Sequence, residues 1–137
     1  MSETRAANPG WNVASLFLLI VIAGCDRPSD EQANAYGYCV GGAGSARSEL
    51  FQRDNLDEAS KLEKLVNEVM DDESVMSYMQ SGVVKHWWNG LYSAQADYLV
   101  AKTKNDLRPF LVRLRQECES AGVEVDLSGF GSEAPAG

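Results

Sequence analysis

The sequence has little positive charge and only one histidine. Its 137 residues include 12 Lys and Arg against 20 Asp and Glu, which gives a formal net charge of −8. Nucleic-acid binding draws its affinity from basic side chains that neutralise phosphates, so this balance argues against a nucleic-acid partner. The three cysteines are scattered and His86 stands alone, so the ligand clusters typical of zinc sites are missing. We therefore expect no metal and no other cofactor.

The chain also lacks the residue patterns of common enzymes. A single histidine can act as a general base, but no serine lies in a nucleophile-elbow motif, and a lone His86 beside two tryptophans is more typical of a structural role. The acidic run of residues 71–73 does not have the spacing of a calcium-binding loop, and the end and capping of helices explain it better. We expect no catalytic residues and a non-enzymatic function.

No apolar run is long enough to span a bilayer comfortably. The segment from Val13 to Gly24 (VASLFLLIVIAG) is free of charge but has only 12 residues, whereas a spanning helix needs about 20. A run of this length at the N-terminus is typical of the apolar region of a signal peptide. An uncleaved N-terminal anchor is the alternative, because Arg5 is the only basic residue before the run.

The run ends in Ile22-Ala23-Gly24-Cys25, which resembles the lipobox of bacterial lipoproteins. The resemblance covers the first 25 residues and implies a diacylglyceryl group on Cys25, with residues 1–24 removed as a signal peptide. Acyl chains on Cys25 would anchor the protein to a membrane of the cell envelope, facing the periplasm. Asp26 resembles the inner-membrane retention signal of enteric bacteria and therefore favours the inner over the outer membrane.

The rest of the sequence predicts an all-α, small four-helix bundle-like domain with one disulfide. We expect a lipid-attached tether over residues 25–32, a helical domain over residues 33–123, and a flexible tail over residues 124–137, which is rich in Gly, Ser, Ala and Pro. Apolar residues recur at three- and four-residue steps in four stretches, at about residues 29–52, 55–70, 72–99 and 105–121. Gly82 and Gly90 leave open whether the third stretch is one helix or two.

The first stretch carries four glycines, Gly37, Gly41, Gly42 and Gly44. Each costs up to about 1 kcal/mol relative to alanine inside a helix. A phosphate-binding loop is the functional alternative, but the segment GGAGSARS lacks the Lys-Ser/Thr pair and the preceding strand. Close packing of this helix against its neighbours is the better interpretation.

Two cysteines remain once Cys25 is assigned to lipid. Cys39 and Cys118 fall on the expected inner faces of the first and last helices, and an even pair in an exported domain predicts a disulfide. Closing a loop of this length is worth on the order of 4 kcal/mol. Two buried free thiols in a cytosolic protein are the alternative.

The aromatic segment around Trp87 and Trp88 is the predicted partner-binding site, together with Tyr92 and Met79. Adjacent residues point about 100° apart on a helix, so one tryptophan is expected inside and the other exposed. Trp and Tyr are enriched at protein-binding hot spots and also at lipid interfaces. We expect a lipid-tethered adaptor, assembly or exclusion factor that binds another envelope protein through a helical face.

Two other functions remain open. Small helical lipoproteins with one disulfide occur among the pilotins, which escort secretins of type II secretion systems, and the chain resembles them in architecture only. A periplasmic enzyme or enzyme inhibitor belongs to a different class. A deep polar cleft around His86 would favour this class, whereas an open apolar surface near Trp87 or Trp88 would favour partner binding.

Overall fold

A computed structural model describes residues 29–71, 73–80 and 82–136 of the chain. The predicted signal peptide, the lipid-attachment residue Cys25 and residues 26–28 of the tether lie outside the described residues.

The described part of the chain consists of helices and contains no strand. The α-helices are α2 (Asp30–Gln52), α3 (Leu56–Asp71), α4 (Glu73–Gln80), α5 (Val84–Lys104) and α6 (Arg108–Ser120), and a 3-10 helix, η1 (Ser128–Glu133), follows. This confirms the predicted all-α fold. The third predicted stretch is two helices, because the chain adopts a left-handed conformation at Gly82, with a φ of 85°, between α4 and α5.

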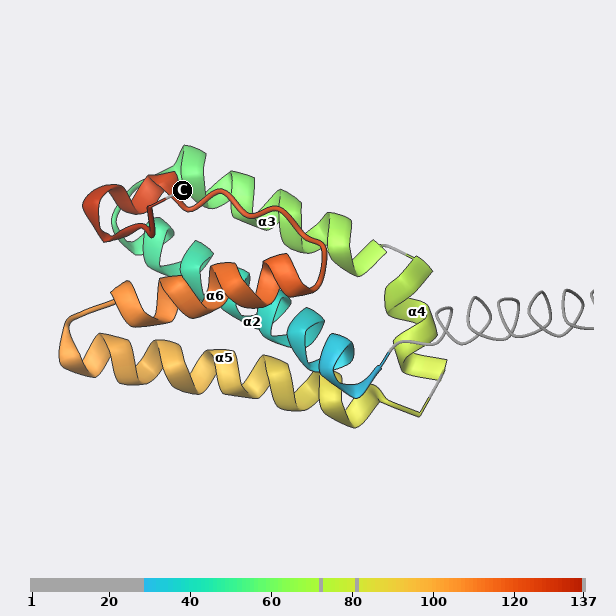
Figure 1. The fold of residues 1–137 in the computed structure, drawn as a ribbon. Coiled ribbons are helices and arrows are strands. Elements are labelled where there is room, and N and C mark those ends of the chain that lie inside the picture. The colour runs from blue at the N-terminus through green and yellow to red at the C-terminus, as the bar shows by residue number, and fades with distance from the viewer. Residues whose placement is uncertain (1–28, 72, 81, 137) are drawn as a thin grey trace, which may run out of the picture.

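Helix α2 lies at the centre of the bundle and contacts α3, α5 and α6 (Figure 1). Two apolar clusters form the core. The larger one joins α2, α3, α5, α6 and the C-terminal segment around the fully buried Leu50, Leu111 and Leu114. The smaller one surrounds Trp87 and joins the first half of α2 to α3, α4 and α5.

The glycines of α2 allow its backbone to lie directly against α5. A Cβ atom added at Gly37 would overlap the carbonyl oxygen of Trp87, and one added at Gly41 would lie 2.7 Å from the carbonyl oxygen of Leu91. Gly90 allows the same close approach from the side of α5, since a Cβ atom added there would overlap the carbonyl oxygen of Asn34 on α2. The predicted close packing of the glycine-rich helix is therefore confirmed.

A disulfide joins Cys39 on α2 to Cys118 on α6, as predicted. The two Cα atoms are 4.8 Å apart, and both residues are buried in the larger cluster. The bond connects positions 79 residues apart in the chain, so it ties the first described helix to the last α-helix.

The structure corrects two of the three predicted domain boundaries, those after residues 32 and 123. The tether was expected to reach residue 32, but α2 already begins at Asp30, because the Ser29 side chain accepts a hydrogen bond from the backbone N–H of Gln32 and caps the helix. The prediction of a flexible tail is wrong for residues 124–136. Leu127 and Phe130 are buried in the larger cluster, and burying these two apolar side chains holds the segment against the bundle.

Polar contacts fix the same C-terminal segment. Arg53 at the end of α2 bonds Glu133 at 2.7 Å, and its guanidinium lies 5.5 Å from the centre of the Phe130 ring. The Asn55 side chain donates a hydrogen bond to the Gly129 carbonyl at 3.3 Å, and Arg115 donates one to the Pro135 carbonyl at 3.1 Å. Residues 124–136 therefore form a strap over the bundle.

Candidate functional site

Helix α5 places the two adjacent tryptophans in different environments. The Trp87 side chain is only 2% exposed, whereas Trp88 is 41% exposed. The two rings meet edge to face, with their centres 4.9 Å apart. The expectation that one tryptophan is inside is correct, but the prediction that Trp87 contacts a partner is wrong, because Trp87 belongs to the core that joins α2, α4 and α5.

Trp88 and Tyr92 form an exposed aromatic pair one helical turn apart. Their rings are stacked, with centres 5.9 Å apart and an interplanar angle of 26°. Tyr92 is 60% exposed. Trp88 is therefore held between the buried Trp87 on one side and Tyr92 on the other. Met79, the fourth predicted contact residue, is also exposed, but it lies on α4 and not on the helix of this pair.

The exposed apolar surface continues along α5 to Leu99 and Val100, which are 63% and 53% exposed. These residues follow Tyr92 by seven and eight positions, so all four lie on the side of α5 that faces away from α2. We call Trp88, Tyr92, Leu99 and Val100 the outer face of α5, the helix that forms the lower edge of the bundle in Figure 1. One feature of the sequence indicates this face. The apolar residues of α5 lie all around the helix instead of along one stripe, so some of them must be exposed.

Charged residues around α5 are distributed unevenly. Asp97, the one carboxylate of the helix, accepts hydrogen bonds from the Tyr38 hydroxyl and from Arg113, both at 2.7 Å, and so faces α2 and α6. Lys85 and Lys104 near the two ends of α5 form no ion pair with any residue that the structure describes. The outer face is consequently flanked by positive charge in a chain that is acidic overall.

A buried carboxylate joins α2 to the far end of α5. Glu49 accepts hydrogen bonds or ion pairs from Arg53, Tyr98 and Lys102, each at 2.8 Å, and its side chain is almost fully buried. Burial alone would raise the pKa of Glu49, but the bonds from Lys102, Tyr98 and Arg53 outweigh it and hold the pKa below its ordinary value. Burial and the bond to Glu49 raise the pKa of Tyr98 to about 12. The network is structural, since Arg53, Tyr98 and Lys102 all converge on the Glu49 carboxylate and join α2 to α5.

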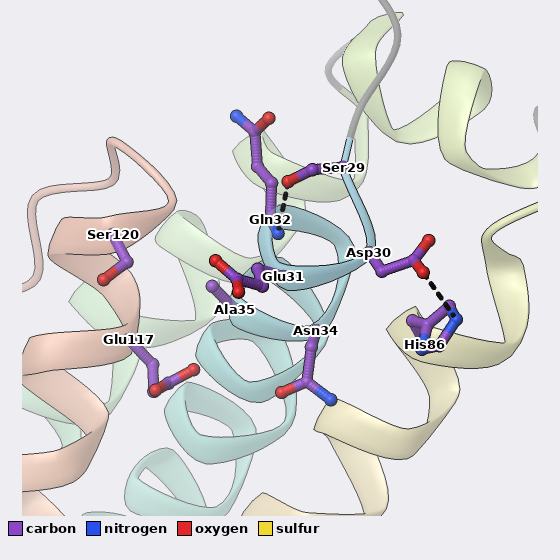
Figure 2. A pocket seen from close by; sticks show the side chains of 9 residues that line it. All are labelled: Ser29, Asp30, Glu31, Gln32, Asn34, Ala35, His86, Glu117 and Ser120. Atoms are coloured by element: carbon purple, nitrogen blue, oxygen red, sulfur yellow. Dashed lines mark hydrogen bonds and ion pairs between the residues drawn. The ribbon is translucent and has the colours of Figure 1, made fainter.

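A polar cavity of about 590 Å³ lies beside His86, where α2 begins (Figure 2). His86 Nε2 lies 3.3 Å from Asp30 Oδ2. Figure 2 shows Glu117 and Ser120 of α6 on the opposite side of the cavity from His86. A histidine–carboxylate pair can exchange protons, but the hydroxyl of Ser29 next to Asp30 caps α2 by accepting the Gln32 N–H, and that of Ser120 lies on the opposite side of the cavity. Asp30, Glu31 and Glu117 make the cavity acidic.

The described residues contain no group of three or more His, Cys, Asp or Glu that could hold a metal ion, and none of their helices is long and apolar enough to cross a membrane. Comparison of the chain with protein-family models, with curated proteins and with solved structures gives no match.

Proposed function

We propose that this protein is a lipid-tethered adaptor, assembly or exclusion factor of the bacterial cell envelope, which binds another envelope protein through the outer face of α5. The observation that carries the proposal is the exposed, stacked pair of Trp88 and Tyr92. Large aromatic rings with few rotatable bonds lose little conformational entropy on binding, and they are enriched at the centres of protein interfaces. Exposed apolar side chains that gather on one face of a helix mark binding surfaces more often than single scattered ones do.

The disulfide supports the proposed compartment. Disulfides persist in oxidising environments such as the periplasm and are rare in the reducing cytosol. Cys39 and Cys118 are bonded and buried in the core, which fits a chain that folds after export. The lipobox-like residues before Cys25 supply the proposed route of export and the anchor, and Asp26 favours retention at the inner membrane.

The proposed anchor is tested by the mass of the N-terminal peptide of the protein purified from membranes. We expect the chain to begin at Cys25 and to carry a diacylglyceryl group, and we expect Cys25→Ala to abolish this modification. A peptide that begins at Met1, or an unmodified Cys25, would contradict the anchor.

The adaptor role is tested by photocrosslinking in cells. Benzoylphenylalanine replaces Tyr92 on the outer face of α5 or, as a matched control, Val112, which is an exposed apolar residue on α6. We expect one discrete protein adduct from position 92 and none from position 112. Equal labelling from both positions, or no protein adduct from position 92, would refute the role.

A second candidate function, an enzyme or enzyme inhibitor acting on envelope substrates, is favoured by one observation, the polar cavity beside His86. Its test is the degradation of cell-wall fragments by the purified chain, measured for the wild type and for His86→Gln. Degradation that is lost in the variant would favour this second function over the adaptor.

A further inference from the structure

We infer that the segment bound by the outer face of α5 is an acidic amphipathic helix of the partner protein. This inference rests on the proposed adaptor function and specifies the chemistry of its partner. The shape of the face, the charges beside it and the comparison with other occupants each support it.

The shape of the outer face suits another helix. Trp88 and Val100 are 12 residues apart, which at 1.5 Å per residue corresponds to about 18 Å, or slightly more than three turns. Trp88, Tyr92 and Leu99 lie within about 40° of one another around the helix, so they form a ridge that can pack into the groove between side-chain rows of a second helix, and Val100 lies beside this ridge. The partner helix would therefore present an apolar stripe of about three turns.

The charges beside the outer face favour an acidic partner. Lys85 lies one turn before Trp88, and Lys104 lies one turn after Val100, so a positive charge stands near each end of the apolar ridge. Neither lysine forms an ion pair with a described residue, whereas Lys102 is paired with Glu49. Asp106, which lines the same hollow as Lys104, is paired with Arg108. Asp97 is bonded to Tyr38 and Arg113 and does not offset them. Carboxylates near both ends of the partner helix would complement this arrangement.

Two other occupants fit the charges less well. In a dimer built on this face, antiparallel α5 helices would place Lys85 of one copy opposite Lys104 of the other, and parallel helices would place each lysine near its counterpart, so like charges would meet in both cases. Helices that bind anionic bilayers carry a polar face rich in Lys and Arg, whereas α5 has two lysines without an ion pair and packs its other face against α2. An acidic protein segment avoids the first conflict and needs only local contact with the two lysines.

The test uses the full chain with benzoylphenylalanine at position 92, crosslinked in cells of the native host. Mass spectrometry identifies the crosslinked segment, which we expect to be an amphipathic helix with Asp or Glu near both ends. Combined Lys85→Glu and Lys104→Glu should lower the adduct yield at least about tenfold, because attraction becomes repulsion at both ends. Replacing the carboxylates of the identified segment with lysine should restore the yield. Lys64→Glu, at an exposed lysine on α3, is the matched control and should leave the yield unchanged.

Several results would overturn the inference. These are a protein adduct on a segment without carboxylates, an adduct yield that is unchanged by the two charge reversals, an adduct with a second copy of the chain, or an adduct with phospholipid. The first two leave the adaptor function standing and refute only the acidic helix. Loss of every protein adduct at position 92 refutes both. Circular dichroism of the charge-reversed chain shows whether its helices are intact, so that loss of folding is not mistaken for loss of binding.

Discussion

The contact between α2 and α5 predicts opposite effects of the same substitution at two glycines, Gly37 and Gly44, which lie seven residues apart on α2. In Gly37→Ala, the new methyl group would overlap the carbonyl oxygen of Trp87 and lie 2.7 Å from its carbonyl carbon. These obstacles are backbone atoms, so no side-chain rotation relieves them and the two helices must separate. In Gly44→Ala, the methyl group meets no atom within 4 Å.

The two substitutions are expected to change the free energy of unfolding in opposite directions. Overpacking costs about 1–3 kcal/mol, and a clash with backbone atoms belongs at the upper end of that range. The higher helix propensity of alanine offsets up to about 1 kcal/mol of this cost. We expect Gly37→Ala to lower the free energy of unfolding by about 2 kcal/mol. Gly44→Ala should raise it by about 0.5–1 kcal/mol, because alanine loses less backbone entropy than glycine in a helix. For a domain of this size, the loss corresponds to a fall in Tm of roughly 7–9 °C.

The assay is urea and thermal unfolding of the full oxidised chain, followed by circular dichroism at 222 nm. Gly90→Ala provides a second variant at the same interface, since its methyl group would overlap the carbonyl oxygen of Asn34 and lie 2.8 Å from the backbone nitrogen of Tyr38. If Gly37→Ala and Gly90→Ala unfold at the wild-type urea concentration, the close approach of α2 and α5 is refuted. If Gly44→Ala is destabilised as much as Gly37→Ala, the effect does not come from that contact.

Three further predictions concern the disulfide, the buried carboxylate and the C-terminal strap. Replacing both Cys39 and Cys118 with serine should lower the free energy of unfolding by about 4.5 kcal/mol, as expected for a bond that spans 79 positions, and urea unfolding that differs by less than about 1 kcal/mol would contradict this entropic estimate. Glu49→Gln removes the charge that Lys102 and Arg53 face; because water still reaches both of these cations, the variant should cost about 1.5–3 kcal/mol at pH 7. Because the folded state lowers the pKa of Glu49, the stabilisation by its carboxylate is present above the ordinary pKa of 4.5 and is lost as the pH falls through the folded pKa. Urea unfolding should therefore show that the difference in free energy of unfolding between wild type and variant shrinks in acid. A difference that does not depend on pH would refute the assignment. Phe130→Ala should cost about 3 kcal/mol and expose residues 124–136 to proteolysis, whereas a flexible tail would show neither effect.

Features that depend on local periodicity could be predicted from the sequence. The apolar repeat of residues 55–70 corresponds to α3 within one or two positions, because a helix is determined largely by its own residues. The Cys39–Cys118 bond could be predicted because one pair remains once Cys25 is assigned to lipid. The strap could not be predicted, since its composition is that of a flexible segment and its order depends on the burial of Leu127 and Phe130 in a distant core.

The candidate site was predictable only in part. Helical geometry requires Trp87 and Trp88 to point in different directions, but it does not say which one faces inward. That choice depends on the register of α5 against α2, where Gly37 meets the backbone of Trp87 and brings its side chain into the core. The burial of Glu49 could not be predicted either, because its partners Tyr98 and Lys102 lie about 50 residues away in the sequence.

The position of the disulfide determines how the domain would respond to mechanical force applied through its N-terminal end. Cys39 lies nine residues beyond Asp30, the start of α2. Those nine residues span about 13 Å as a helix and about 30 Å when fully extended, so a pull on the segment before Ser29 can lengthen the chain by roughly 17 Å before the load reaches the sulfur atoms. Beyond that point the covalent bond passes the load directly to α6. In the reduced chain no covalent bond limits this extension, and the pull would unravel α2 through its whole length.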